Sequence, residues 1–336
     1  MTPLRLDELL NRLPSVSIAV FGDFFLDKYL ILDPDLTEVS IETGLPAHQV
    51  VSERCQAGAA GTVANNLRAL GVGTVEAVGF RGADGDGYEL RRALRRIGAS
   101  TTTLLDTDER CTPCYCKPLI CRDGQPPEEL SRLDTKNRTT TSPQLEDRML
   151  EALEIVASRC QAVIVVDQVQ EPDCGVVTSR LRDFLGQLAQ VAPELVMMAD
   201  SRCHIGAFRH LSIKPNAHEA QATFGQEAPD VLAARLSAEL GRPVFITQGG
   251  DGVVAGWDGQ ASWVPGITVP EPTDIVGAGD SFCAASVAAL TAGATAVEAA
   301  QLGCLVASIT VQQLGTTGTA SPDQVRARLL ESPYVQ

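Results

Sequence analysis

The stretch from Pro272 to Phe282 places small residues and a carboxylate directly before an apolar, alanine-rich run. Its small residues are Gly277, Ala278 and Gly279. We expect the run to form a helix, so that free backbone N–H groups and the positive end of the helix dipole lie at these residues. Such an N-terminus suits a phosphate or the charge that develops on a moving phosphoryl group. Asp280, in the first turn, is placed to take a proton from an attacking hydroxyl.

A simpler interpretation of this stretch is a capped helix after a tight loop, with Asp280 serving only the cap. A single Gly-x-Gly-Asp pattern does not separate the two interpretations. Polar residues elsewhere in the chain favour the chemical one.

Four apolar segments each end in a polar side chain that can bind a ligand. The end residues are Asp23, Asp167, Asp200 and Asn216. Apolar strands that alternate with helical segments predict an α/β fold in which a mostly parallel sheet is covered on both faces. Because such sheets bind ligands at the carboxyl ends of their strands, we expect these side chains at one edge of the sheet.

Two segments, at about 29–56 and 101–134, carry short β-like runs broken by proline and glycine. We interpret them as lid strands that flank the main sheet. The alternation continues through the chain without a linker or repeat, which predicts a single domain over residues 1–336. Gly58 and Ala59 lie between the two segments, at the glycine-rich start of an expected helix. Small residues at this place allow either a ligand to approach the backbone closely or the helix to pack closely.

The second lid segment also contains a group of cysteines: Cys111, Cys114, Cys116 and Cys121. Their spacing lacks the paired Cys-x2-Cys pattern of common zinc sites, so structural thiols are favoured over zinc. The other cysteines lie mostly in apolar runs, as in reduced cytosolic proteins.

The amino-acid composition limits the classes of partner that the chain can bind. The net charge is -15 and aromatic residues make up 4% of the chain, which disfavours nucleic acid and anionic membranes. No apolar run approaches the length of a transmembrane helix, and the N-terminus lacks a signal-peptide core, so we expect a cytoplasmic protein.

Five motifs in order resemble the ribokinase-like (PfkB) family of carbohydrate kinases. They are Gly22-Asp23-x3-Asp27, Gly58-Ala-Ala-Gly61, Asn216-Ala-His-Glu219, Gln248-Gly-Gly-Asp-Gly252 and Asp274-Ile-Val-Gly-Ala-Gly-Asp280. The resemblance implies a three-layer ribokinase-like sandwich with a small β lid. It also implies transfer of the γ-phosphoryl group of ATP to a sugar hydroxyl.

Within that family the chain is similar to heptose-7-phosphate kinases of ADP-heptose synthesis, which implies a heptose 7-phosphate phosphorylated at its anomeric position. The supporting stretches are Ser40–Pro46, Ser131–Asp134 and Gln313–Thr317. Another PfkB-type kinase, acting on a nucleoside or a fructose phosphate, is the first alternative. A catalytically silent sugar- or nucleotide-binding regulator is the second.

The resemblance also implies residue roles. Asp280 would be the base, and the amides of Gly277, Ala278 and Gly279 would be the anion hole. Sugar-binding positions would be Asp23, Asp27, Gly58, Ala59, Asn66 and Lys117. Nucleotide-binding positions would be Asn216, Glu219, Thr247, Gly249, Gly252 and Cys304. Glu219 would hold Mg²⁺ through water, and Asp274, Thr310, Gly315 and Thr319 fall where some relatives hold a monovalent cation such as K⁺.

A simpler structural role is an alternative for Lys117 and for the pair Asn216 and Glu219. Lys117 could reach a substrate phosphate, but a solvated lysine is the favoured interpretation. Asn216 with Glu219 is a common capping pair. Some residues also depart from the family pattern, at Val276, Gly61-Thr62 and Cys304, and 168–175 lacks an expected lysine. Because family members often pair through their lids, the resemblance implies a homodimer.

Overall fold

The computed structural model of the chain describes residues 1–122 and 127–335. Its strands are β1 (Ser17–Gly22), β2 (Phe24–Val39), β3 (Pro46–Ala59), β4 (Thr74–Gly82), β5 (Leu104–Thr107), β6 (Cys114–Ile120), β7 (Glu128–Glu129), β8 (Leu133–Thr135), β9 (Ala162–Asp167), β10 (Val196–Ser201), β11 (Ser212–Ile213), β12 (Val244–Thr247), β13 (Gly252–Trp257) and β14 (Gln260–Pro265). Its helices are α1 (Pro3–Arg12), α2 (Ala60–Ala69), α3 (Gly85–Arg96), α4 (Pro143–Ala157), α5 (Ser179–Val191), α6 (Ala217–Phe224), α7 (Pro229–Leu240), α8 (Ala278–Thr291), α9 (Ala296–Thr310) and α10 (Pro322–Glu331).

The main sheet has nine strands in the order β14-β13-β12-β11-β10-β9-β1-β4-β5. The strands from β12 to β5 are parallel, and β13 and β14 are antiparallel. Parallel strands buried on both faces require continuous apolar sequence, which β9 supplies with six buried residues. The predicted α/β class with a mostly parallel sheet is confirmed.

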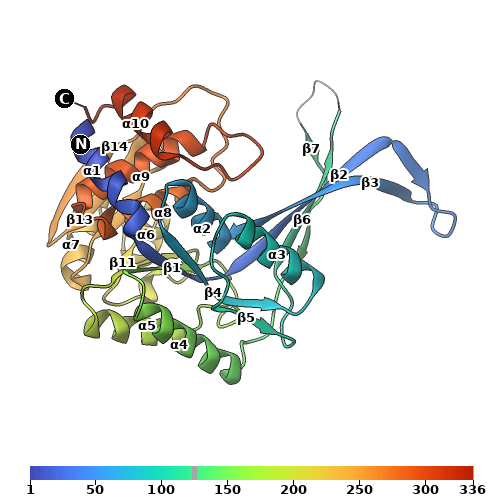
Figure 1. Cartoon of the computed structure of the whole chain (residues 1–336), viewed down its shortest axis with the longest axis horizontal. Helices are drawn as coiled ribbons and strands as arrows, with labels where there is room; N and C mark the ends of the chain where they lie inside the picture. The colour runs from blue at the N-terminus through green and yellow to red at the C-terminus, as the bar shows by residue number, and fades with distance from the viewer. Residues whose placement is uncertain (123–126, 336) are drawn as a thin grey trace.

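Two hydrophobic cores cover the two faces of the sheet. Ile18 and Val20 of β1 belong to the core formed with α1, α2, α3, α8, α9 and α10. The alternate residues Ala19 and Phe21 belong to the core formed with α4, α5, α6 and α7. The result is a three-layer sandwich (Figure 1).

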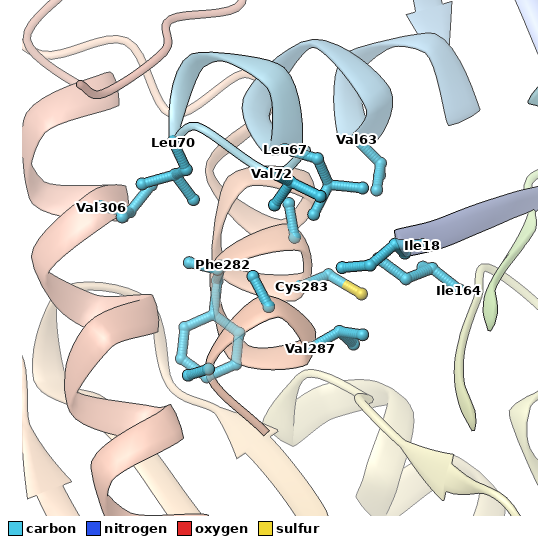
Figure 2. Packing of buried hydrophobic residues seen from close by; sticks show 14 of the residues in the cluster. Ile18, Val63, Leu67, Leu70, Val72, Ile164, Phe282, Cys283, Val287 and Val306 are labelled. Atoms are coloured by element: carbon cyan, nitrogen blue, oxygen red, sulfur yellow. The ribbon is translucent and has the colours of Figure 1, made fainter. Parts of the chain in front are cut away.

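Helix α8 lies in the middle of the first core. Figure 2 shows Cys283 of α8 directed toward Ile18 and Ile164 of the sheet, with Leu67 of α2 on the neighbouring side. Every residue from Ser281 to Ala289 is buried. This all-round burial fixes the helix, so the polar residues at its N-terminus are held at the sheet edge.

A second sheet, in the order β3-β2-β6-β7 with β8 paired to β6, forms the lid. Its β2–β3 ribbon projects from the body of the molecule (Figure 1). The first predicted lid segment was too short, because β2 and β3 extend back to Phe24 and on to Ala59 without a break at the body. The second predicted segment is divided, since β5 pairs with β4 in the main sheet; residues 123–126 lie outside the described part.

The helix predicted to start at Gly58–Gly61 is confirmed as α2, which begins at Ala60 with Ala59 as its N-cap. Gly58 and Ala59 are also the last residues of β3, so the strand leads directly into the helix. None of the described helices is long and apolar enough to span a membrane.

Candidate active site

A cavity of about 650 Å³ opens at the carboxyl edge of the main sheet. Its lining includes the proposed base, the glycine-rich helix start and all the predicted nucleotide positions: Gly277, Ala278, Gly279, Asp280, Asn216, Glu219, Thr247, Gly249, Gly252 and Cys304. These residues come from four separate segments of the chain. The structure therefore brings the two predicted groups together in one hollow.

The N-terminus of α8 presents free donors to this cavity. Gly277 caps the helix with a left-handed φ of 81°, a conformation that glycine adopts without strain. Among the described residues, the N–H groups of Gly277 and Gly279 have no protein acceptor. The N–H of Ala278 donates to the carbonyl of Ile275 at 3.1 Å, so in this conformation Ala278 does not supply the third free amide that the resemblance implied.

Asp280 is partly buried and makes no ion pair or hydrogen bond with the side chains of the described chain. Burial raises its pKa to about 7, and the neighbouring Asp200 adds to the rise, while Lys214 and Arg202 oppose it. A carboxylate with a pKa near the working pH is suited to accept a proton and to release it again.

The raised pKa predicts a pH-dependent change in stability when Asp280 becomes asparagine. The native carboxyl binds its proton more tightly than the unfolded one, so the native state loses stability as pH rises from about 4 to about 7. An asparagine side chain at this position does not titrate and removes this loss. We expect Asp280→Asn to raise Tm by about 2–4 °C at pH 8 and by much less at pH 5, measured by calorimetry. An equal shift at both pH values would contradict the raised pKa.

Lys214 is a cavity residue that the sequence reasoning missed. Its ammonium group pairs with Asp200 at 3.1 Å, and the residue is only 5% exposed. A methyl group built on Gly279 would lie 3.5 Å from its Nζ atom, so the cation stands beside the start of α8. The sequence did contain a sign that Lys214 lies near the site, because Lys214 directly precedes Pro215-Asn216 at a strand end. It supplies a cation where the sequence suggested that one was missing.

Asn216 and Glu219 form a capping box on α6. The Asn216 side chain accepts from the Glu219 N–H at 2.8 Å, and Glu219 Oε2 accepts from the Asn216 N–H at 2.9 Å. This is the capping geometry expected from the simpler interpretation. Both residues also line the large cavity, where the Glu219 carboxylate can accept hydrogen bonds. An oxygen ligand at this position fits a Mg²⁺ ion held through water.

The predicted nucleotide loop follows β12. Gly249 and Gly252 have φ values of 59° and 110°, and the Gln248 N–H donates to the Gly252 carbonyl at 2.8 Å. The turn therefore needs glycine at both positions. Across the cavity, burial raises the pKa of the Cys304 thiol to about 11, so it lines the hollow as a neutral group.

A smaller cavity of about 170 Å³ adjoins the large one, and Gln168 and Arg202 line both. Asp23 lines the smaller cavity, but its carboxylate accepts N–H groups of Gln168, Val169 and Val176 at 2.8, 3.1 and 2.8 Å. Burial raises its pKa to about 6. Asp23 therefore organises the 168–176 loop as well as facing the cavity.

Lys117 is not a solvated lysine. Its Nζ atom pairs with Asp27 at 3.0 Å and lies 4.9 Å from the centre of the Tyr29 ring, and its side chain is 15% exposed. A methyl group on Gly58 would overlap Asp27 Oδ2, so Gly58 makes room for this pair. Neither cavity is lined by these residues or by Ala59, which ends β3 with a φ of 52°.

Asn66 is fully buried on α2 and lines neither cavity. Its amide nitrogen donates to the carbonyls of Thr62 and Gly318 at 3.0 and 3.3 Å. The structure therefore places it in the interior, where it ties α2 to the segment before α10.

The predicted monovalent-cation positions lie in one region near the start of α8. Asp274 Oδ2 accepts from the Gly315 N–H at 3.2 Å, and the Thr310 and Ser281 hydroxyls are 3.0 Å apart. Thr319 is joined to this region through Gln313 at 3.2 Å. Elsewhere, no group of three or more His, Cys, Asp or Glu side chains suited to a metal occurs within residues 1–122 and 127–335, and the four clustered cysteines are free thiols.

Comparison with known proteins gives the family. The pattern of pfkB family carbohydrate kinases matches residues 29–324. The bifunctional protein HldE of Trichlorobacter lovleyi is 26% identical over 332 residues, which are 96% of this chain and 64% of HldE. HldE of Hyphomonas neptunium is 28% identical over 336 residues, 97% of this chain and 66% of the relative. The chain thus spans about two thirds of the length of these relatives.

Solved structures agree on the fold. Phosphofructokinase-2 from Escherichia coli in complex with potassium superposes with a TM-score of 0.70 at 16% identity, covering 94% of this chain and 98% of that one. Arabidopsis thaliana ribokinase complexed with ribose and ATP gives 0.65 at 17% identity, covering 94% and 98%. The expected ribokinase-like fold is confirmed. The chain belongs to the pfkB family of carbohydrate kinases, and it is a phosphotransferase with a sugar hydroxyl as acceptor.

Proposed function

We propose that the chain transfers the γ-phosphoryl group of ATP to a hydroxyl of a phosphorylated sugar, with heptose 7-phosphate as the first candidate. One observation carries the proposal: Asp280 and the unpartnered amides of Gly277 and Gly279 face the same large cavity. The HldE relatives supply the heptose candidate.

In this proposal the acceptor oxygen forms a bond to the γ-phosphorus as the bond to the bridging oxygen of ADP breaks. The acceptor proton moves to Asp280, whose pKa of about 7 allows it to be taken up near neutral pH. The amides at the start of α8 and the ammonium of Lys214 stabilise the charge on the transferred group. Mg²⁺, when bound near Glu219, would offset charge on the nucleotide phosphates.

A screen of acceptors tests the proposal. ADP release would be measured with ATP, Mg²⁺ and heptose 7-phosphate, fructose 6-phosphate, ribose, fructose or adenosine, with Asp280→Ala as the background enzyme. We expect ADP release above the background with at least one sugar phosphate. If ATP binds but none of the acceptors exceeds the background, the chain is better described as a binding regulator.

We further propose that two copies pair through the β2–β3 ribbon. The outer edge of β3 has no neighbouring strand in the lid sheet of the described chain, and the ribbon exposes large apolar side chains. They are Leu36, Val39, Ile41, Leu45, Val50 and Val51, each at least 50% exposed. A second copy of the ribbon would cover them.

Negative charges introduced into the β2–β3 ribbon should dissociate the proposed dimer into single chains. Light scattering at micromolar concentration should give twice the 35.6 kDa chain mass for the wild type. Leu36→Glu with Val50→Glu should give the single-chain mass, because both charges would be buried at the interface. Leu330→Glu, at an apolar residue on α10 that is 68% exposed, is the control and should stay dimeric. A monomeric wild type would contradict this proposal.

A further inference from the structure

Tyr334 is a buried polar residue that the proposed mechanism does not use. It follows α10, which packs with α9 beside β14 (Figure 1), and it is only 6% exposed, in the core that also holds Cys304. Its hydroxyl reaches a segment 69 residues earlier in the chain, where it donates to the Pro265 carbonyl at 2.5 Å. Burial of a hydroxyl is costly unless the group is bonded, so this bond holds Tyr334 and Pro265 together.

Pro265 ends β14 and leads directly into one wall of the large cavity. The four residues that follow it, from Gly266 to Val269, all line the cavity. The Gly266 N–H donates to the Asp251 carbonyl at 3.1 Å, inside the loop that carries the predicted nucleotide glycines. A methyl group built on Gly266 would overlap the Gly250 carbonyl, so the two segments are in backbone contact. A shift of the wall at Pro265 would therefore disturb the nucleotide loop as well.

Tyr334 also adjoins the wall that α9 forms. Cys304, Ala307 and Ser308 line the cavity from this helix. Burial raises the pKa of the Cys304 thiol to about 11, and hydrogen bonding by the Tyr334 hydroxyl opposes that rise, so the two groups are neighbours. One hydroxyl thus lies behind two walls of the same cavity.

The chemistry of these walls indicates which part of a nucleotide they would hold. The free amides and the Lys214 cation, which suit phosphate, lie at the start of α8. The walls next to Tyr334 instead present neutral side chains, including Ile267 and Val269 on one and Cys304 and Ala307 on the other. A mostly apolar surface with few polar groups suits an uncharged base and ribose.

We infer that Tyr334 is a positioning residue for the nucleoside part of ATP, and that its hydroxyl holds the wall at Pro265 against the wall at Cys304. The inference rests on the proposed binding of ATP in the large cavity. Within the described chain Tyr334 lines neither cavity, so it acts on the nucleotide only through its neighbours. Without the hydroxyl, the two walls lose their common anchor.

Tyr334→Phe tests the inference, because it removes the hydroxyl and keeps the ring in the core. Ser237→Ala is the matched control, since the Ser237 hydroxyl on α7 is also buried and donates to the Ala234 carbonyl at 2.9 Å. It accepts the Gly259 N–H at 3.2 Å, at the turn of the same β13–β14 hairpin, but Ser237 lines neither cavity. Both variants therefore lose hydrogen bonds of a buried hydroxyl, and only Tyr334 adjoins the cavity walls.

The measurements are the dissociation constants of ADP and of a non-hydrolysable ATP analogue by calorimetry, Tm, and kcat with the best acceptor of the screen. Tyr334→Phe should raise both dissociation constants about 5- to 10-fold, the effect of about one lost hydrogen bond. The factor should be the same for both nucleotides, because these walls do not hold the γ-phosphate. At saturating ATP, kcat should stay within about two-fold of the wild type. Ser237→Ala should lower Tm and leave both dissociation constants unchanged.

Three outcomes would overturn the inference. Unchanged dissociation constants in Tyr334→Phe would leave the hydroxyl a purely structural role, whatever the loss in Tm. An equal rise in Ser237→Ala would assign the effect to general loosening of the hairpin. A loss confined to kcat would place the effect at the reacting groups.

Failure of the kinase proposal is distinguishable from failure of this inference, because nucleotide binding is measured without an acceptor. It would appear as no Asp280-dependent ADP release with any acceptor, while calorimetry still compares the nucleotide affinities of the three proteins.

Discussion

Replacing Asp280 with asparagine is expected to lower kcat for sugar phosphorylation by about 10³-fold, the loss typical of a removed general base. Asparagine has nearly the same shape but cannot accept the acceptor proton. KM for ATP should change by less than about three-fold, because the amides of Gly277 and Gly279 and the cation of Lys214 stay in place. For the wild type, kcat/KM should fall as pH drops below about 7, since Asp280 is then protonated.

The matched control for this variant is Asp323→Asn. The Asp323 side chain is 94% exposed on α10 and lies outside both cavities, so its kcat should equal that of the wild type. Retention of more than a tenth of wild-type kcat in Asp280→Asn would show that another group takes the proton.

Replacing Lys214 with methionine is expected to damage both the fold and the reaction. The variant would leave the carboxylate of Asp200, only 9% exposed, without its partner. Removing one member of a buried ion pair costs about 3–5 kcal/mol of unfolding free energy, measured by urea titration. The cation beside the start of α8 would also be lost, so we expect kcat to fall at least about 10²-fold.

A double variant separates the two effects. Lys214→Met with Asp200→Asn removes both charges, and it should recover most of the lost unfolding free energy. It should not recover kcat, because the missing cation acts on the phosphoryl group and not on Asp200. If the double variant regains wild-type turnover, the role of Lys214 is only structural.

The layers of the fold and the helix that carries the base could be predicted because they depend on local patterns. Continuous apolar runs such as Ala162–Asp167 identify buried parallel strands, and β9 has these same bounds. A glycine-rich stretch before an alanine-rich run predicts a buried helix, and α8 begins at Ala278. Polar residues at strand ends predicted the edge of the sheet at which the cavities open.

Other features depended on contacts between distant segments. The pairing of Lys117 with Asp27 requires β6 to lie beside β2, a register that neither strand specifies alone. The occupied N–H of Ala278 depends on how the preceding loop turns back at Ile275. The length of the lid ribbon was underestimated, because the start of β2 from Phe24 to Leu26 is buried and apolar like the strands of the main sheet, and only the pairing with β3 assigns it to the lid.

Arg132, Lys136 and Arg202 line the smaller cavity, and these cations were missed for the same reason. Arg132 lies in the Ser131–Asp134 stretch that supports the resemblance, but only the pairing of β8 with β6 brings Arg132 and Lys136 over Tyr115. Arg202 follows β10, and the fold places it at the junction of the two cavities.

The most direct test of the account is a crystal structure of the chain with a non-hydrolysable ATP analogue, Mg²⁺ and a sugar phosphate. We expect the γ-phosphate within hydrogen-bond distance of the Gly277 and Gly279 amides, with a sugar hydroxyl between it and the Asp280 carboxylate. A nucleotide bound elsewhere, or a γ-phosphate directed away from the start of α8, would contradict it.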